Sequence, residues 1–375
     1  MDRVFPFCYP APTAFYLSAY MASLLVHLVF MQYVLAGSAY LVFGRFLDRP
    51  MFGARQRGSE SPSDDFQPDV IHETLRDWLP FATSAAITAG VAPLLFLQIL
   101  YRKSFYTANL LLFHRWMAIV PVLIVGFYLL YLLKTERIRR GPAWKESAIA
   151  LTALACFGFT AWSWTENHML SLDAKSWAEV YQRGELMHHT PGAYLRTLGW
   201  FLSSFPAMLL LVAWQIHGRR SDIATASRRL TYKLAGLANL MLIFGTTVLL
   251  YAILLKPTPA PHESHQGDAD AYAWLLASGM IIQLLGWMFQ SRLDSLRRNL
   301  LLVCTVGQLA VLISIVAVRE LGRVARIDMG ELSQAHADAF RVAGLPIFIF
   351  FLIFNAALVA WCIRVATRGP RPTRP

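Results

Sequence analysis

The sequence predicts an all-α protein, a polytopic membrane helical bundle of about nine transmembrane helices. Three observations support this fold class. Of the 375 residues, 56% are apolar and only 15% are charged, and the apolar residues gather into long stretches. Soluble domains average about 45–50% apolar and about 25% charged residues, whereas about 20 consecutive apolar residues suffice to cross a bilayer. The composition therefore excludes an ordinary soluble enzyme and a disordered regulator.

The apolar stretches define the elements, and polar segments separate them. None alternates with the period of two that membrane barrel strands show. The first begins too late, and is too long, for a cleaved signal peptide. The connecting segments are too short for a folded extramembrane domain, so residues 1–375 are predicted to form a single integral-membrane domain. The predicted spans are approximately 15–43, 79–100, 106–133, 147–164, 194–216, 232–255, 272–290, 299–318 and 344–363.

The net charge of +11 is explained by the connecting segments and not by nucleic-acid binding. Alternate loops together with the C-terminal tail hold 22 Lys and Arg residues, whereas the N-terminus and the other loops hold 11. Cytoplasmic loops carry an excess of these residues. We therefore expect the N-terminus outside and the C-terminus in the cytoplasm, which requires an odd number of spans. The expected location is a bacterial-type inner membrane, with the lipid bilayer as surroundings and no nucleic-acid partner.

Two connecting segments and the cysteines add further expectations. The loop 45–78 is first rich in Gly, Ser and Asp and then amphipathic at Val70–Trp78, which predicts a helix lying at the membrane interface. A segment rich in Pro, His and Asp, Pro257–Asp270, links the sixth and seventh spans. No CxxC pattern is present, which argues against a disulfide framework, a zinc ribbon or a covalently attached haem. The four cysteines are Cys8, Cys156, Cys304 and Cys362.

Ionisable residues inside a membrane span are costly, and they are functional candidates by default. Three stand out: His27 in the first span, and His114 and Arg115 in the third. We expect no Asp or Glu deep in any span. Proton-coupled transporters usually need such carboxylates, and no matched pair of broken helices is evident, so a transporter is disfavoured.

Three side chains could hold an iron. His27 lies near the middle of the first span and is either a metal ligand or a histidine hydrogen-bonded to a neighbouring helix. His189 lies just before the fifth span, where Pro191 suits the first helical turn, and so at the outer mouth of the bundle. Met280 lies in the outer half of the seventh span. A methionine there is usually packing filler, but beside a histidine it is a good axial haem ligand.

Together these residues resemble subunit I of the cytochrome bd-type terminal oxidases. That family also has nine spans and an outer N-terminus. The similar segments are VHLVFMQYVLAG around His27, AGVAPLLFLQILYRKSFY around Gly90, HTPGAY from His189 to Tyr194, and the basic tail from Arg364. The resemblance implies one or two haems b, with His189 and Met280 holding a low-spin haem and His27 holding a second one.

The same resemblance implies a haem-binding electron-transfer subunit of a respiratory complex, an oxidoreductase with other membrane subunits as partners. The chain departs from the family in its third and last spans, which lack the family's carboxylates, and in a shortened quinol loop. His114 is then a substitute haem ligand, or Arg115 pairs with a haem propionate. A c-type cytochrome could replace quinol as electron donor. The alternative is a non-catalytic membrane scaffold that has lost some or all haems.

Overall fold

The computed structural model describes residues 10–47, 70–218, 228–255, 266–324, 329–342 and 345–367. These residues form helices and short connections, with no β-strand among them. Cys8 and most of the two predicted loops, at 48–69 and 256–265, lie outside the described residues. The helices are α1 (Ala11–Leu47), α2 (Val70–Leu100), α3 (Arg102–Leu111), α4 (Phe113–Leu133), α5 (Glu136–Arg139), α6 (Ala143–Ser171), α7 (Trp177–Arg183), α8 (Ala193–Gly218), α9 (Arg228–Leu255), α10 (Gln266–Ser291), α11 (Arg298–Val324), α12 (Met329–Val342) and α13 (Leu345–Thr367).

Eight of these helices are long and apolar enough to cross a membrane, which confirms the all-α class and a multi-pass membrane protein. They are α1, α2, α4, α6, α8, α9, α10 and α11. The ninth predicted span, 344–363, corresponds to α13, of which the described apolar part, Ile349–Val365, is shorter than the other eight. Prolines such as Pro93 and Pro206 lie inside continuous helices.

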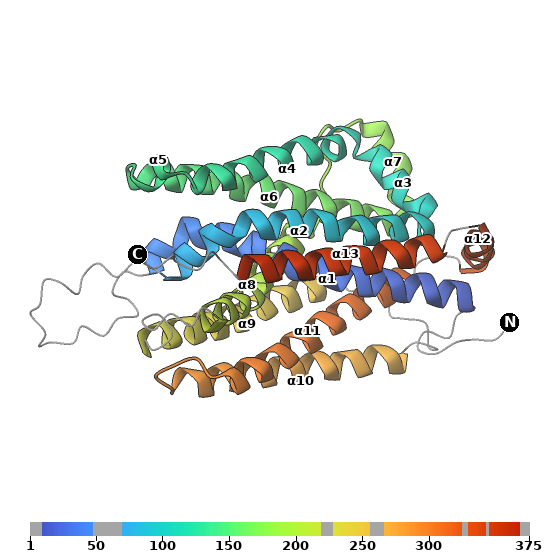
Figure 1. Ribbon diagram of the computed structural model, residues 1–375. Coiled ribbons are helices and arrows are strands. Elements are labelled where there is room, and N and C mark those ends of the chain that lie inside the picture. The colour runs from blue at the N-terminus through green and yellow to red at the C-terminus, as the bar shows by residue number, and fades with distance from the viewer. Residues whose placement is uncertain are drawn as a thin grey trace, which may run out of the picture.

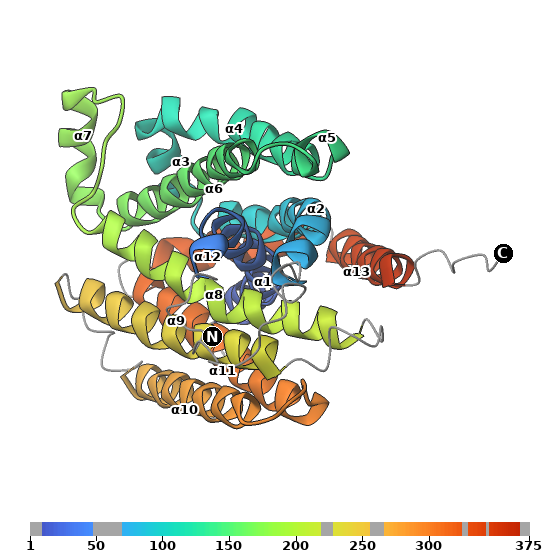
Figure 2. The same ribbon diagram turned by 90° about the vertical axis from the view of Figure 1, so that its left-hand side faces the viewer.

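The long helices run side by side along the length of the molecule (Figure 1), with α7 and α12 at one end and α5 at the other. We call these the α12 end and the α5 end. In the view along the bundle α1 lies near the centre, with α4 and α6 on one side and α8 to α11 on the other (Figure 2). The most extensive helix–helix contacts are those of α1 with α2, α10 with α11, α8 with α9, and α4 with α6.

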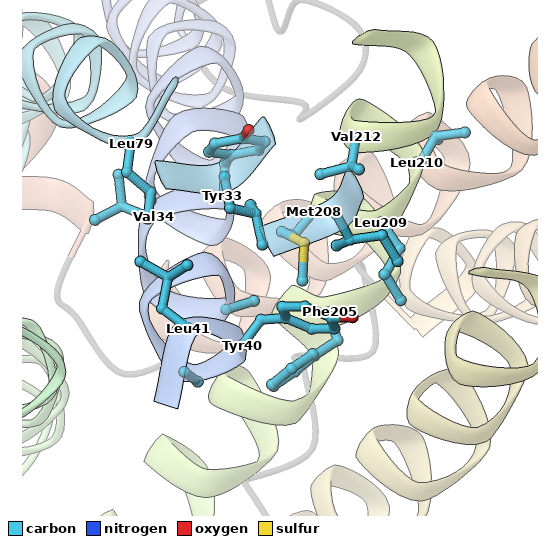
Figure 3. Packing of buried hydrophobic residues seen from close by; sticks show 14 of the residues in the cluster. Tyr33, Val34, Tyr40, Leu41, Leu79, Phe205, Met208, Leu209, Leu210 and Val212 are labelled. Carbon is cyan, nitrogen blue, oxygen red and sulfur yellow. The ribbon is translucent and has the colours of Figure 1, made fainter. Parts of the chain in front are cut away.

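The largest buried cluster lies where α1 crosses α8. Tyr33 and Tyr40 of α1 face Phe205 and Met208 of α8, and all four belong to the cluster (Figure 3). Met208 is fully buried, and α8 buries a larger share of its apolar window than any other candidate span. Since lipid tails are as apolar as these side chains, this contact is held by close packing and not by escape from water.

The amphipathic segment Val70–Trp78 is not a separate interfacial helix, as the sequence predicted, but the first part of α2. Its apolar face is covered by protein, because Ile71, Leu75 and Leu79 are all fully buried. Gly37 of α1 lets the two helices approach, since a Cβ there would lie 3.0 Å from a methyl carbon of Leu79. The apolar stripe that suggested a membrane surface is therefore a helix–helix contact.

The predicted third span, 106–133, is divided into α3 and α4 at Leu112, whose φ of −98° and ψ of 22° leave the α-helical region. The side chain of Leu112 is buried in a small cluster with Ala108, Leu170 and Val180. This cluster joins α3 to α6 and α7 at the α12 end. The break starts α4 beside the end of α6, which positions Arg115 for the contacts described below.

Candidate functional site: buried charges and the predicted iron ligands

The imidazole of His27 is held against α2. Its Nδ1 lies 2.9 Å from the carbonyl oxygen of Ala86. Because a carbonyl only accepts hydrogen bonds, Nδ1 must carry the proton, and Nε2 keeps its lone pair. The described residues make no hydrogen bond to Nε2. His27 therefore fits both alternatives left by the sequence, since it is bonded to a neighbouring helix and still has one nitrogen free for a metal.

Gly90, one turn beyond Ala86 on α2, makes room for this ring. A Cβ at Gly90 would lie 3.0 Å from both Cε1 and Nδ1 of His27. That is closer than almost all real contacts of a Cβ atom. The glycine in the segment AGVAPLLF is thus required by the position of the imidazole and not by the backbone of α2, which stays helical.

His189 lies in the connection that precedes α8, at the α12 end. Its side chain is exposed, and its ring centroid lies 5.9 Å from that of Tyr194. Tyr194 in turn stacks on Trp162 of α6, with ring centroids 5.3 Å apart. This agrees with the predicted position at the mouth of the bundle.

Met280 lies in the interior of the bundle. Its sulfur is 3.7 Å from Oγ1 of Thr246, and it lines a pocket together with Ser203 of α8. Ser203 is ten residues from Ala193, the start of α8, which is about 15 Å at 1.5 Å per residue. His189 lies beyond that start. Two axial ligands of one iron must be only a few ångströms apart, so the structure does not bring His189 and Met280 together.

His114 points away from the bundle. It is exposed at the start of α4, with its ring against that of Phe113 at a centroid distance of 5.4 Å. Its neighbour Arg115 takes the opposite direction and is 2% exposed. No hydrogen bond or ring contact among the described residues joins His27, His114, His189 and Met280 to one another. No group of three His, Cys, Asp or Glu side chains with metal-binding spacing occurs in this part of the chain either.

Arg115 belongs to a buried ion pair with Glu166 of α6. The closest nitrogen and oxygen atoms are 4.0 Å apart, and neither side chain is exposed. Arg115 also donates to Ser163 Oγ at 3.1 Å and to the carbonyl oxygen of His188 at 2.9 Å, and its guanidinium lies 3.5 Å from the ring centroid of Trp162. The arginine therefore joins α4, α6 and the connection before α8.

Glu166 completes this cluster from the other side. One carboxylate oxygen accepts the backbone N–H of Thr190 at 2.8 Å, and the other accepts Trp162 Nε1–H at 3.2 Å. A buried carboxylate is costly unless it is paired and hydrogen-bonded, and here it has both. The connection that carries His188 and His189 is consequently held to the bundle at two points.

A second buried network lies at the same end, around Glu320 of α11. Tyr101 donates its hydroxyl to Glu320 Oε2 at 3.0 Å, and Arg323 lies 3.4 Å from the same oxygen. Arg323 also lies over the Tyr101 ring, 4.6 Å from its centroid, and its Nη2 is 2.6 Å from Nδ1 of His168. Burial and the Glu320 carboxylate, together with smaller contributions, raise the pKa of Tyr101 well above its ordinary value. The hydroxyl therefore stays protonated and can donate.

Both networks place a carboxylate inside a candidate span but close to its end, so they extend the predicted spans and do not contradict the expectation that no carboxylate lies deep in one. The predicted spans 147–164 and 299–318 stop before Glu166 and Glu320, but α6 continues to Ser171 and α11 to Val324. Hydropathy falls at these charged residues, which ends the predicted spans. The partner of Glu166 lies 51 residues away along the sequence, and the partner of Glu320 lies 219 residues away. Beyond the two carboxylates the helices continue as mostly buried segments, Asn167 to Ser171 and Leu321 to Val324. The apolar residues of these segments are the sequence signal that could have located Glu166 and Glu320.

A third buried carboxylate lies at the opposite, α5 end. Oε1 of Glu146, in the first turn of α6, is 3.5 Å from His72 Nε2 and 3.9 Å from an Nη of Arg76. Both partners belong to α2, and all three side chains are almost completely buried. Buried carboxylates therefore anchor both ends of α6.

α12 covers the α12 end of the bundle through His336. Nδ1 of this buried imidazole is 2.9 Å from Thr13 Oγ1, and Nε2 is 3.2 Å from the carbonyl oxygen of Leu100. The carbonyl requires Nε2–H, so Nδ1 accepts the hydroxyl of Thr13, and the neutral ring uses both nitrogens. Burial lowers the pKa of His336, although the bond to Leu100 opposes the shift.

Comparison of the chain with known protein families, with curated proteins and with solved structures finds no match among them.

Proposed function

We propose that this protein is a haem b-binding electron-transfer subunit of a membrane complex, with His27 as a ligand of the haem iron. The observation that carries the proposal is the hydrogen bond from His27 Nδ1–H to the Ala86 carbonyl. Histidines that bind metals typically donate their other ring N–H to a carbonyl or carboxylate, which fixes the tautomer and the orientation of the ring. Bound haem would supply one-electron redox chemistry.

The residues around His27 have defined tasks in this proposal. Ala86 fixes the protonated nitrogen, and Gly90 leaves the space in which the ring lies against α2. Nε2 stays deprotonated and directs its lone pair away from that carbonyl. The predicted low-spin pair, His189 and Met280, is separate from this site in the structure, and the proposal does not rest on it.

The topology is part of the proposal. With α13 counted, the chain has nine spans, an outer N-terminus and a cytoplasmic C-terminus. Two observations support this: α13 has 23 residues, about 34 Å at 1.5 Å per residue, and Lys and Arg are distributed 22 to 11 between the two sets of loops. The membrane would be a bacterial-type inner membrane, and the partners other membrane subunits with a c-type cytochrome as electron donor. The α12 end, which carries His189, would then face outward.

A reduced-minus-oxidised absorption spectrum of the purified full-length chain tests the haem. We expect difference bands of haem b in the wild type and their loss or shift in His27→Ala. His217→Ala is the matched control, because His217 lies in the last turn of α8, far along the chain from His27. Among the described aromatic residues its ring contacts only that of Trp214. A wild-type protein without haem bands, or a His27→Ala spectrum equal to that of His217→Ala, contradicts the proposal.

The second candidate is a non-catalytic membrane scaffold that has lost its haems. Two observations favour this scaffold: His189 is separated from Met280, and His114 points away from the bundle. In these positions the three side chains cannot hold one ligand together. The same spectrum distinguishes the candidates. Absence of haem from a folded protein that still co-purifies with other membrane subunits supports the scaffold.

A further inference from the structure

The interior of the bundle contains a pocket between α1, α8, α9, α10 and α11. It holds about 410 Å³ of unfilled space, its open part included. One part of its wall is polar, and the rest is aliphatic. The polar part consists of Gln32, Ser203, Thr246, Met280 and Gln308. Each of these lies nine or more residues from either end of its helix, so the pocket is at the depth of the middle of the bundle.

Two side-chain amides in this wall have an unused group. Oε1 of Gln32 and Oε1 of Gln308 are both buried, and neither has a hydrogen-bond partner in the described structure. Gln32 is 1% exposed and Gln308 6%. A buried polar atom without a partner costs about 1–3 kcal/mol. Two such atoms in the wall of one pocket are explained if something else in the pocket bonds to them.

Two further polar groups of the wall can accept hydrogen bonds, and the Ser203 hydroxyl can donate or accept. The Thr246 hydroxyl donates to the carbonyl oxygen of Leu242 at 2.7 Å, so its oxygen offers only lone pairs to the pocket. Met280 adds a thioether, a weak acceptor. None of the described residues that line the pocket is ionisable, so a charged ligand would be buried beside them without a counter-charge, at high cost. The wall thus suits a neutral molecule that can donate a hydrogen bond to the amide oxygens of Gln32 and Gln308.

We propose that this pocket binds a small, neutral, mostly apolar molecule that carries a hydroxyl group, with the amides of Gln32 and Gln308 as its hydrogen-bond partners. The aliphatic wall, which includes Leu276 and Val311, contacts the apolar body of the ligand. The site is separate from His27, which is absent from the wall. The proposal is independent of haem binding, and it assigns Met280 to a different site from the one that the sequence suggested.

Two probes of nearly equal shape test the role of the ligand's hydroxyl group. p-Fluorophenol carries a hydroxyl group at the position where p-fluorotoluene carries a methyl group. Binding to the full-length chain in lipid nanodiscs is followed by fluorine NMR, with empty nanodiscs as the blank. We expect the wild type to bind the phenol about tenfold more tightly than the toluene, the effect of one or two net hydrogen bonds. Equal binding of the two probes overturns the proposal and indicates that water is the hydrogen-bond partner of the two amides.

Variants connect the preference to the two amides. Gln32→Leu and Gln308→Leu should each reduce the preference for the phenol to threefold or less, whereas Gln182→Leu, on the exposed surface of α7, should leave it unchanged. The melting temperature of the protein without probe should rise in Gln308→Leu, because an unpartnered polar atom is removed. Gln308→Met, which keeps the side-chain length, is the second variant. An unchanged preference in both amide variants, or a lower melting temperature in both Gln308 variants, overturns the proposal.

Discussion

Gly279 of α10 and Gly307 of α11 face each other so closely that a Cβ on either would lie 2.8 Å from the carbonyl oxygen of the other. The backbones of the two helices are therefore in direct contact at this level. Small residues at such positions let membrane helices pack when no hydrophobic force draws them together. The contact lies one residue from Gln308 and Met280, so it also sets the width of the pocket.

Gly307→Ala should destabilise the protein by about 1–3 kcal/mol, the usual cost of forcing extra atoms into a packed interface. Unfolding in a denaturing detergent, followed by circular dichroism, measures the change. Gly158→Ala is the control, because a Cβ at Gly158 meets nothing within 4 Å. It should be neutral or stabilising by up to about 1 kcal/mol, since alanine is the better helix former. Equal effects of the two substitutions would contradict the close contact.

Removing one member of the Arg115–Glu166 pair should cost more than removing both. Arg115→Leu or Glu166→Leu leaves a buried charge without its partner, at a cost of about 3–5 kcal/mol. The double variant should cost less than the sum of the two single ones, because neither charge remains. A double-mutant cycle on the free energy of unfolding measures this difference. Additive costs would show that the two side chains act independently.

The packing of α12 should weaken in acid because of His336. Its pKa is lowered in the folded protein, whereas in the unfolded chain it has the ordinary value of about 6.5. At a pH between these two pKa values, His336 takes up a proton in the unfolded chain but not in the folded protein. Stability is therefore full above about pH 6.5 and falls as the pH decreases through the folded-state pKa. Hydrogen exchange of the α12 amides across this range measures the effect. In His336→Leu the protection factors of these amides, which are the exchange rates corrected for the intrinsic rate at each pH, should no longer respond to pH, and a persistent response would assign it to another group.

Gly90→Ala should displace His27 while α2 stays helical. The new methyl group would lie 3.0 Å from two ring atoms, so the imidazole must move and its bond to Ala86 must lengthen. If His27 binds haem, the iron signal in electron paramagnetic resonance should shift or broaden. Gly158→Ala again serves as the control with unchanged spectra. A haem signal insensitive to Gly90→Ala would argue that another side chain holds the iron.

The sequence was sufficient for what depends on local composition. Apolar stretches located eight spans to within several residues at most ends, and the isolated histidine in the first span, His27, is indeed half-buried beside another helix. It was insufficient where the decisive partner is far along the chain. The pattern of Val70–Trp78 predicts a surface helix, because nothing in the local sequence shows that α1 covers it. The predicted span 147–164 ends before Glu166, because the partner that allows this carboxylate to be buried, Arg115, belongs to another helix.

The candidate site shows the same division. The residue types of His189 and Met280 suggested a shared ligand, but their relative position depends on where α8 and α10 start and on how these helices pack. The unpartnered amides of Gln32 and Gln308 carry no local signal, because a glutamine in a span is identical in sequence whether or not its amide is bonded. Such polar atoms are recognised only once the surrounding helices are placed.

The last helix has a consequence for the order of assembly. The described side chains of α13, at 349–365, are exposed or half-buried, and the buried core is built from residues up to Val324, with His336 of α12 added at one end. Chains fold from the N-terminus during synthesis. Every helix needed for the core is therefore available before α13 leaves the ribosome, so α13 can join a bundle that is already folded and present its apolar surface to lipid.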